Sequence, residues 1–176
     1  MKQASTEIVI WDPLVRIFHW STALLFLLNI TVLEDGGTLH EWVGYTIAAL
    51  VMVRILWGFI GSERARFRSF YPTRTRIRHH LNALWHRRTD PAEGHNPLGG
   101  AMVLALLFML LLVALSGWML TWDLFWGEDL LEEVHEAFAN LTIFLVGVHV
   151  AAVLIMPRLT GIALIRPMIS GKRSLK

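Results

Sequence analysis

Two histidines lie fourteen residues apart in one apolar stretch, residues 133–156, with His135 near its start and His149 inside it. On an α-helix, fourteen residues rise about 21 Å in just under four turns, so both imidazoles face one side near opposite membrane surfaces. An ionisable side chain inside hydrocarbon is expensive and indicates a functional site by default. The spacing therefore suits two cofactors stacked across a bilayer, each held by one of these histidines and a partner from elsewhere in the chain.

The composition limits what such a cofactor can be. The chain has 176 residues, of which 55% are hydrophobic, and this is too apolar for an ordinary soluble domain of its length. It contains no cysteine, which excludes disulfides, iron–sulfur clusters, thiolate zinc sites and covalently attached haem. We therefore expect one membrane domain, in which any haem is held without covalent links.

Four apolar stretches predict four transmembrane helices. They cover approximately residues 17–33, 40–60, 98–120 and 134–156, the last ending before Pro157, and each is near the length that crosses a hydrocarbon core of about 30 Å. Asn96 and Pro97 supply a helix cap followed by proline at the first helical position. No small-residue cleavage site follows the first stretch, which we expect to remain in the mature protein. The expected fold is an all-α bundle of four membrane-spanning helices.

The stretch from residue 61 to residue 96 is basic, with eight arginines and four histidines. Its apolar side chains recur at helical spacing between arginines, and this pattern predicts an amphipathic helix in the headgroup region. The residues concerned are Ile77, Leu81, Leu84 and Trp85, with Arg74, Arg78, Arg87 and Arg88 around them. By the positive-inside rule we expect this loop and the basic tail from Arg158 to lie in the cytoplasm, and with four spans both termini are expected there too. Arginines beside membrane spans usually contact anionic lipid, which disfavours a nucleic-acid partner.

This topology pairs four histidines by depth. His19 lies near the cytoplasmic end of span one and pairs with His149, while His40 opens span two at the outer side and pairs with His135. Each pair is expected to supply both axial ligands of one haem iron inside the bundle. One histidine at a helix end is more often an ordinary interfacial residue, so the pairing of all four favours ligation. With both axial positions filled, the implied chemistry is electron transfer and not oxygen binding.

Two arginines accompany the inner pair. Arg54 lies fourteen residues after His40, on the same helix face but at the inner level, and Arg16 lies three residues before His19. Both are expected to pair with propionates of the inner haem, although either could instead extend its charge to the membrane surface.

Small residues follow each of these histidines by about one helical turn. They are Ala23, Gly44 and Ala139, four residues after a histidine, and Ala152, three residues after one. They would clear space for a porphyrin, or they could serve close helix packing.

The remaining polar groups have weaker interpretations. His79, His80, His86 and His95 are expected to be solvated or to contact headgroups, and the alternative is that His79, His80 or His95 borders a quinone pocket. The acidic turn before span four is expected to be a solvated connector, or else a docking site for a positively charged periplasmic partner. Its acidic residues are Asp123, Glu128, Asp129, Glu132 and Glu133. We find no nucleotide-binding loop, nucleophile triad or hydrolytic carboxylate pair.

The sequence resembles the bacterial cytochrome b561 family, and within it the di-haem b-type cytochrome subunits associated with nickel–iron hydrogenases. The matching segments cover nearly the whole chain and are WDPLVRIFHW (Trp11 to Trp20), LHEWVGY (Leu39 to Tyr45), RILWGFIGSERARF (Arg54 to Phe67), GHNPLGGAM (Gly94 to Met102), LSGWML (Leu115 to Leu120) and the pair His135 and His149. The resemblance implies a four-helix membrane protein with two non-covalent haems b, axial ligands at His19, His40, His135 and His149, and electron exchange with quinone.

Three functions compete at this point. The first is an electron conduit, a subunit of a membrane oxidoreductase that links the quinone pool to a periplasmic redox protein such as a cytochrome c or a hydrogenase. The second is a stand-alone enzyme, similar to family members that oxidise superoxide and reduce quinone; the acidic outer face would repel this anion. The third, a haem-free transporter or scaffold, does not explain the paired histidines.

Overall fold

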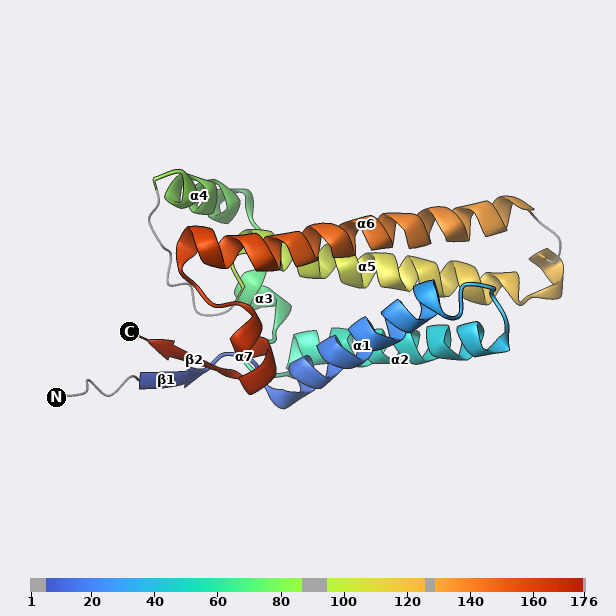
Figure 1. Cartoon of the computed structure of the whole chain (residues 1–176), viewed down its shortest axis with the longest axis horizontal. Helices are drawn as coiled ribbons and strands as arrows, with labels where there is room; N and C mark the ends of the chain where they lie inside the picture. The colour runs from blue at the N-terminus through green and yellow to red at the C-terminus, as the bar shows by residue number, and fades with distance from the viewer. Residues whose placement is uncertain (1–5, 87–94, 126–128, 176) are drawn as a thin grey trace. The chain divides into compact units, whose positions relative to one another are not determined.

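The computed structural model describes residues 6–86, 95–125 and 129–175 (Figure 1). Its elements are β1 (Thr6–Val9), α1 (Pro13–Thr31), α2 (Thr38–Ile60), α3 (Phe67–Phe70), α4 (Arg74–Trp85), α5 (Pro97–Leu120), the 3₁₀ turn η1 (Asp123–Phe125), α6 (Asp129–Thr160), α7 (Ile165–Ser170) and β2 (Lys172–Leu175). The helices α1, α2, α5 and α6 are long and apolar enough to cross a membrane. The predicted all-α fold with four spans is confirmed. Arg87, Arg88, the rest of the basic loop to residue 94, and Glu128 lie outside the described residues.

The chain forms two compact units. Unit 1 comprises Met1–Ile17, Trp57–Met102 and His149–Lys176, and unit 2 comprises Phe18–Leu56 and Val103–Val148. Each of the four long helices contributes a segment to both units, because every unit boundary falls inside one of these helices. Unit 1 therefore holds both short strands and the basic loop, while unit 2 holds the connections from α1 to α2 and from α5 to α6.

The first three spans begin and end close to the positions expected from the sequence. For α5 the expected cap is present, because the side-chain Oδ1 of Asn96 accepts a hydrogen bond of 2.7 Å from the backbone N–H of Gly99. The connection from α1 to α2 passes through Gly36, whose φ of +71° is in the left-handed region that glycine adopts without strain. A short turn thus joins the first two spans.

Helix α6 differs from its prediction at both ends. It begins at Asp129 and not near residue 134, and the acidic side chains in its first turn are stabilised by the positive end of the helix dipole. The expectation that it ends before Pro157 is wrong, because the helix continues to Thr160. A proline removes one backbone hydrogen bond, and membrane helices tolerate this where other groups satisfy nearby carbonyls. Here the Arg158 guanidinium donates to the Leu154 carbonyl at 2.6 Å, and the helix ends at Gly161, whose φ is +72°.

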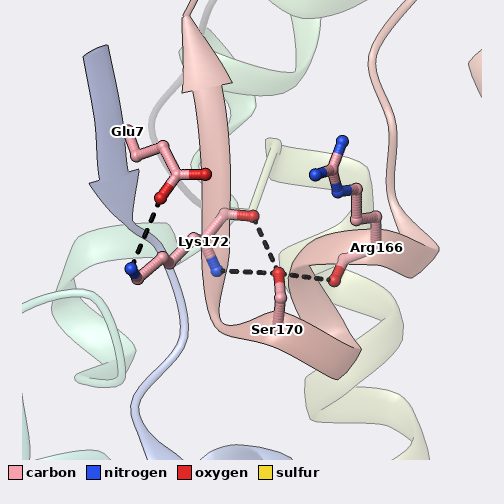
Figure 2. A network of polar contacts seen from close by, with 4 residues as sticks. All are labelled: Glu7, Arg166, Ser170 and Lys172. Carbon is pink, nitrogen blue, oxygen red and sulfur yellow. Dashed lines mark hydrogen bonds and ion pairs between the residues drawn. The ribbon is translucent and has the colours of Figure 1, made fainter. Parts of the chain in front are cut away.

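The strands β1 and β2, which the sequence did not predict, pair antiparallel with Thr6 opposite Leu175. Figure 2 shows the polar contacts that secure this pair: the Lys172 ammonium lies 3.3 Å from the Glu7 carboxylate, and the Ser170 hydroxyl donates to the Arg166 carbonyl at 3.0 Å. The pairing joins the segment before α1 to the segment after α7.

Asp12 fastens the start of α1 to the end of α2 within unit 1. Its Oδ1 accepts a hydrogen bond of 2.9 Å from the backbone N–H of Val15, and its Oδ2 accepts one of 3.0 Å from the Trp57 indole and another from the Ser62 hydroxyl. A hydrophobic core cluster of the same unit consists of Ile10, Trp11, Val15 and Ala65, and Trp57 packs against it. One carboxylate thus serves as a helix cap and as an acceptor for a second segment of chain.

Helix α4 confirms the amphipathic helix predicted in the basic loop. The Thr73 hydroxyl caps it by accepting from the backbone N–H of Arg76. His80 is buried at 6% exposure, whereas Leu81 and Trp85 are exposed at 50% and 86%. Leu81 and Trp85 are therefore the apolar side chains of α4 that are free to contact lipid, whereas Ile77 and Leu84 are partly buried.

We predict that Asp12→Ala lowers the free energy of unfolding by on the order of 2 kcal/mol, because three donors lose a charged acceptor. The measurement is thermal unfolding of the detergent-solubilised protein followed by circular dichroism. Glu7→Gln is the matched control, since its ion pair with Lys172 is about half exposed and contributes less than about 1 kcal/mol. Equal melting temperatures for the two variants would contradict the role of Asp12.

Candidate functional site

The structure brings His40 and His135 together in unit 2. His40 is the third residue of α2, and His135 lies in the second turn of α6. The centroids of their rings are 6.3 Å apart, and the ring planes are inclined at 71°. Two imidazoles that are far apart in sequence therefore face each other from different helices.

The Nδ1 atom of His40 is fixed by the loop before its helix. It lies 2.8 Å from the backbone carbonyl oxygen of Leu33. A carbonyl oxygen can only accept, so Nδ1 carries the proton and donates it. The lone pair of the neutral ring is then on Nε2, the atom that remains available to bind a metal.

His135 is held in the same tautomer by a side chain of α5. Its Nδ1 lies 2.9 Å from the hydroxyl oxygen of Ser116, which is also 2.8 Å from the Leu112 carbonyl oxygen and 3.1 Å from that of Val113. A helical serine commonly donates to such a preceding carbonyl, and with its proton there the serine oxygen accepts from Nδ1–H of the histidine. Nε2 of His135 therefore also carries the lone pair.

The separation of the two rings fits a single metal ion between them. An imidazole nitrogen binds a transition metal at about 2 Å, and the ring centre lies about 1 Å further away, so rings on opposite sides of one ion have centroids about 6 Å apart. The 6.3 Å between His40 and His135 matches this distance. Two imidazoles on opposite sides of one iron are a ligand set that proteins use for haem.

Gly44 lies one turn after His40 in α2, and its immediate surroundings are open. A Cβ atom added at Gly44 would have no described heavy atom within 4 Å, apart from its own helix and neighbours. Glycines that serve close packing behave differently, since a Cβ at Gly58 would clash with the Phe67 ring. The surroundings of Gly44 therefore do not support close helix packing at this position, and cofactor space beside it stays a prediction.

Two residues beside His135 were not identified from the sequence. Ser116 is 4% exposed and supplies the acceptor for Nδ1, and a Cβ at Gly117 would lie 3.0 Å from Cε1 of the histidine. Both belong to the segment LSGWML that was noted for its resemblance, but a serine and a glycine in an apolar helix are common at packing interfaces. The position of Ser116 nineteen residues before His135 carries no local signal that the two side chains meet.

A comparison with protein families now identifies the chain. The model of the prokaryotic cytochrome b561 family matches residues 10–171, which is nearly the whole sequence. The chain belongs to this family. It is therefore a bacterial membrane protein that binds haem b and transfers electrons.

One curated relative of this cytochrome is the probable Ni/Fe-hydrogenase B-type cytochrome subunit of Azotobacter vinelandii. The two are 26% identical over a match that covers 53% of this chain and 50% of the relative. The cytochrome thus aligns with about half the length of this relative. No solved structure matches it.

The residues assigned to the inner haem are divided between the two units of the cytochrome. His19 and Arg54 belong to unit 2, and Arg16 and His149 to unit 1. Arg54 is buried in α2 at 2% exposure, and the His19 ring packs edge-on against Trp20 with centroids 5.1 Å apart. One guanidinium nitrogen of Arg16 donates to the Ile169 carbonyl at 2.6 Å, which ties α1 to α7. Pairing of His19 with His149 stays a prediction.

The histidines of the basic loop do not all lie in solvent. His79 and His86 are exposed, as expected, but His80 is buried, and His95 packs between the rings of Trp11 and Phe70 at centroid distances of 4.4 and 4.8 Å. The expectation that all four are solvated or contact headgroups is therefore wrong for His80. His80 lies one helical turn from Ile77 and from Leu84, which are both partly buried, so it belongs to the side of α4 that is covered.

We predict that Gly44→Phe lowers the amount of haem bound per chain, because the ring would fill the open space one turn after His40. Gly44→Ala should keep the haem content of the wild type, since a methyl group meets no described atom there. The measurement is the pyridine haemochrome assay on purified protein, with circular dichroism to establish that both variants fold. A folded Gly44→Phe variant with unchanged haem would refute the proposed cofactor space.

Proposed function

We propose that this cytochrome carries two haems b and conducts electrons across the bacterial inner membrane between the quinone pool and a periplasmic redox partner. The observation that carries the proposal is the pair His40 and His135, whose rings have the separation that one iron requires and whose Nδ1 atoms are both hydrogen-bonded. We treat residues 1–176 as a single membrane domain, since both compact units are built on the same four helices.

A second haem is proposed between His19 and His149. The support is the continuity of α6, in which His135 and His149 are separated by fourteen residues of unbroken helix, or about 21 Å. Arg54 and Arg16 are proposed to pair with propionates of this inner haem. The burial of Arg54 supports its role, because a guanidinium inside a membrane span needs an anion or polar groups around it.

The distribution of charge supports an orientation. The sequence segments of unit 2 contain nine acidic residues and one basic residue, whereas those of unit 1 contain five acidic and fifteen basic residues. The formal charges are thus −8 and +10, which together give the +2 of the chain. In unit 1, burial and the neighbouring charge of Arg64 lower the pKa of Arg173, as expected where basic groups are crowded. By the positive-inside rule we propose that the basic loop and both termini are cytoplasmic, and that His40 and His135 lie towards the periplasm.

The ligand set determines what the site can do. A bound haem b supplies an iron that alternates between the ferric and ferrous states. His40 and His135 would fill both axial positions, which leaves no position for oxygen or for a substrate. The Leu33 carbonyl and the Ser116 hydroxyl keep each imidazole in one tautomer and orientation, so little rearrangement accompanies the change in charge. Electrons would enter and leave at the edge of the macrocycle, one at a time.

Exposed carboxylates support a protein partner on the periplasmic side. They lie at the ends of α2 and α6 and in the connections of unit 2, and they are Glu34, Asp35, Glu41, Asp123, Asp129, Glu132, Glu133 and Glu136. Such a surface attracts a basic redox protein and repels the superoxide anion, so the conduit is favoured over the superoxide:quinone oxidoreductase. The name of the Azotobacter vinelandii relative makes a hydrogenase one candidate partner, and a cytochrome c is the other.

We predict that redox-difference spectra of the purified cytochrome show low-spin haem b at two haems per chain. His40→Ala and His135→Ala should each remove the same haem, and His19→Ala and His149→Ala should each remove the other, because each iron loses one axial ligand. The measurement is a potentiometric titration of every variant, in which the two haems separate by midpoint potential. Loss of the same haem by both His19→Ala and His135→Ala would break the pairing, and a wild-type stoichiometry of one would refute the two-haem proposal.

We predict that electron transfer from the quinol-reduced cytochrome to a basic cytochrome c slows roughly 10-fold between low and physiological salt, because opposite charges steer the encounter. The double substitution Glu132→Gln and Glu133→Gln should slow transfer at low salt, while Glu63→Gln in unit 1 should not. The measurement is stopped-flow absorbance. Salt-independent transfer would contradict an acidic docking surface, and rapid quinone-dependent consumption of superoxide without any added protein would favour the stand-alone enzyme.

A further inference from the structure

Helix α5 contributes to the pair His40 and His135 although it holds neither histidine. Its residues Ser116 and Gly117 both lie against the His135 ring, at 2.9 Å from Nδ1 to the serine oxygen and at 3.0 Å from Cε1 to the position of an added Cβ at the glycine. The Ser116 hydroxyl contacts Nδ1, and Gly117, which has no side chain, lies next to Cε1 of the same imidazole. Together they limit the positions that the ring can adopt.

We propose that Ser116 and Gly117 are positioning residues for the outer haem, a role that rests on the proposed ligation by His135. Ser116 fixes the tautomer and the rotation of the ring, because it accepts the Nδ1 proton while its own proton is held by the Leu112 carbonyl. Gly117 allows the edge of the ring to approach the α5 backbone. Neither residue contacts the iron.

The burial of Ser116 makes this contact consequential. The side chain is 4% exposed, so no bulk water replaces the serine oxygen if it is removed, and Nδ1–H would lose its acceptor in an apolar setting. Hydrogen bonding of Nδ1–H to an acceptor makes an imidazole a more basic ligand, which stabilises ferric over ferrous iron. Loss of the serine hydroxyl should therefore raise the midpoint potential of the outer haem.

The two axial ligands are held by different kinds of acceptor. His40 donates to a backbone carbonyl in the connection from α1 to α2, which no side-chain substitution removes, whereas His135 donates to a side chain. Substitutions at Ser116 can therefore change the midpoint potential of the outer haem while both histidine ligands are kept.

The test uses the full-length protein reconstituted with haemin. Ser116→Ala should bind the outer haem about 10- to 100-fold more weakly, raise its midpoint potential and leave the inner haem unchanged, and Ser116→Thr should restore both properties by returning the hydroxyl. Thr142→Val is the matched control, because Thr142 is also a buried hydroxyl of unit 2 but donates only to the Phe138 carbonyl of its own helix. The readouts are Soret titration and potentiometry.

Gly117→Ala tests the second contact independently. The added methyl should rotate the His135 ring away from its inclination of 71° to His40 and change the anisotropy of the low-spin EPR signal, which depends on the angle between axial imidazole planes. Unchanged affinity, potential and EPR signal in Ser116→Ala and Gly117→Ala would overturn the inference. If His135→Ala keeps both haems, the proposed ligation itself fails, so the two failures are distinguishable.

Discussion

A neutral imidazole inside a membrane has two nitrogen atoms that need partners, and this requirement governs the centre of unit 2. Nδ1 of His40 is satisfied by the Leu33 carbonyl, and Nδ1 of His135 by the Ser116 hydroxyl, so the lone pair on each Nε2 remains for a metal. The acceptors come from the loop before α2 and from α5. The relative placement of α2, α5 and α6 in this unit is therefore tied to the protonation of two rings.

Charged residues are divided unequally between the two units. Unit 1 gathers the arginines of the basic loop and tail, and unit 2 carries most of the carboxylates. A net charge of only +2 is thus the sum of a strongly basic unit and a strongly acidic one, and this division is the basis of the orientation proposed above. A charge total alone would have concealed this property.

The sequence was sufficient for the features that depend on composition and length. The four spans follow from apolar stretches long enough to cross a bilayer, and the start of α5 follows from Asn96 and Pro97. The boundaries of α6 were harder to predict, because an acidic first turn resembles a loop and Pro157 resembles a helix end in sequence. The strands β1 and β2 are short and separated by most of the chain, so no local sequence pattern predicts that they pair.

The candidate site divides in the same way. The approach of His40 to His135 was foreseen because helical rise and loop charge determine depth, whereas ligation by these residues is a proposal that the geometry supports. Ser116 and Gly117 could not be foreseen, since their role depends on how α5 is rotated relative to α6, and each span is apolar nearly all round. The burial of His80 depends likewise on which side of α4 faces its unit.

The pairing of β1 with β2 has a consequence for biosynthesis. Residues 6–9 leave the ribosome early, but their partners at 172–175 are added only after all four long helices have been made. The first strand must therefore stay unpaired throughout membrane insertion, and formation of the two-stranded sheet is a late event of assembly.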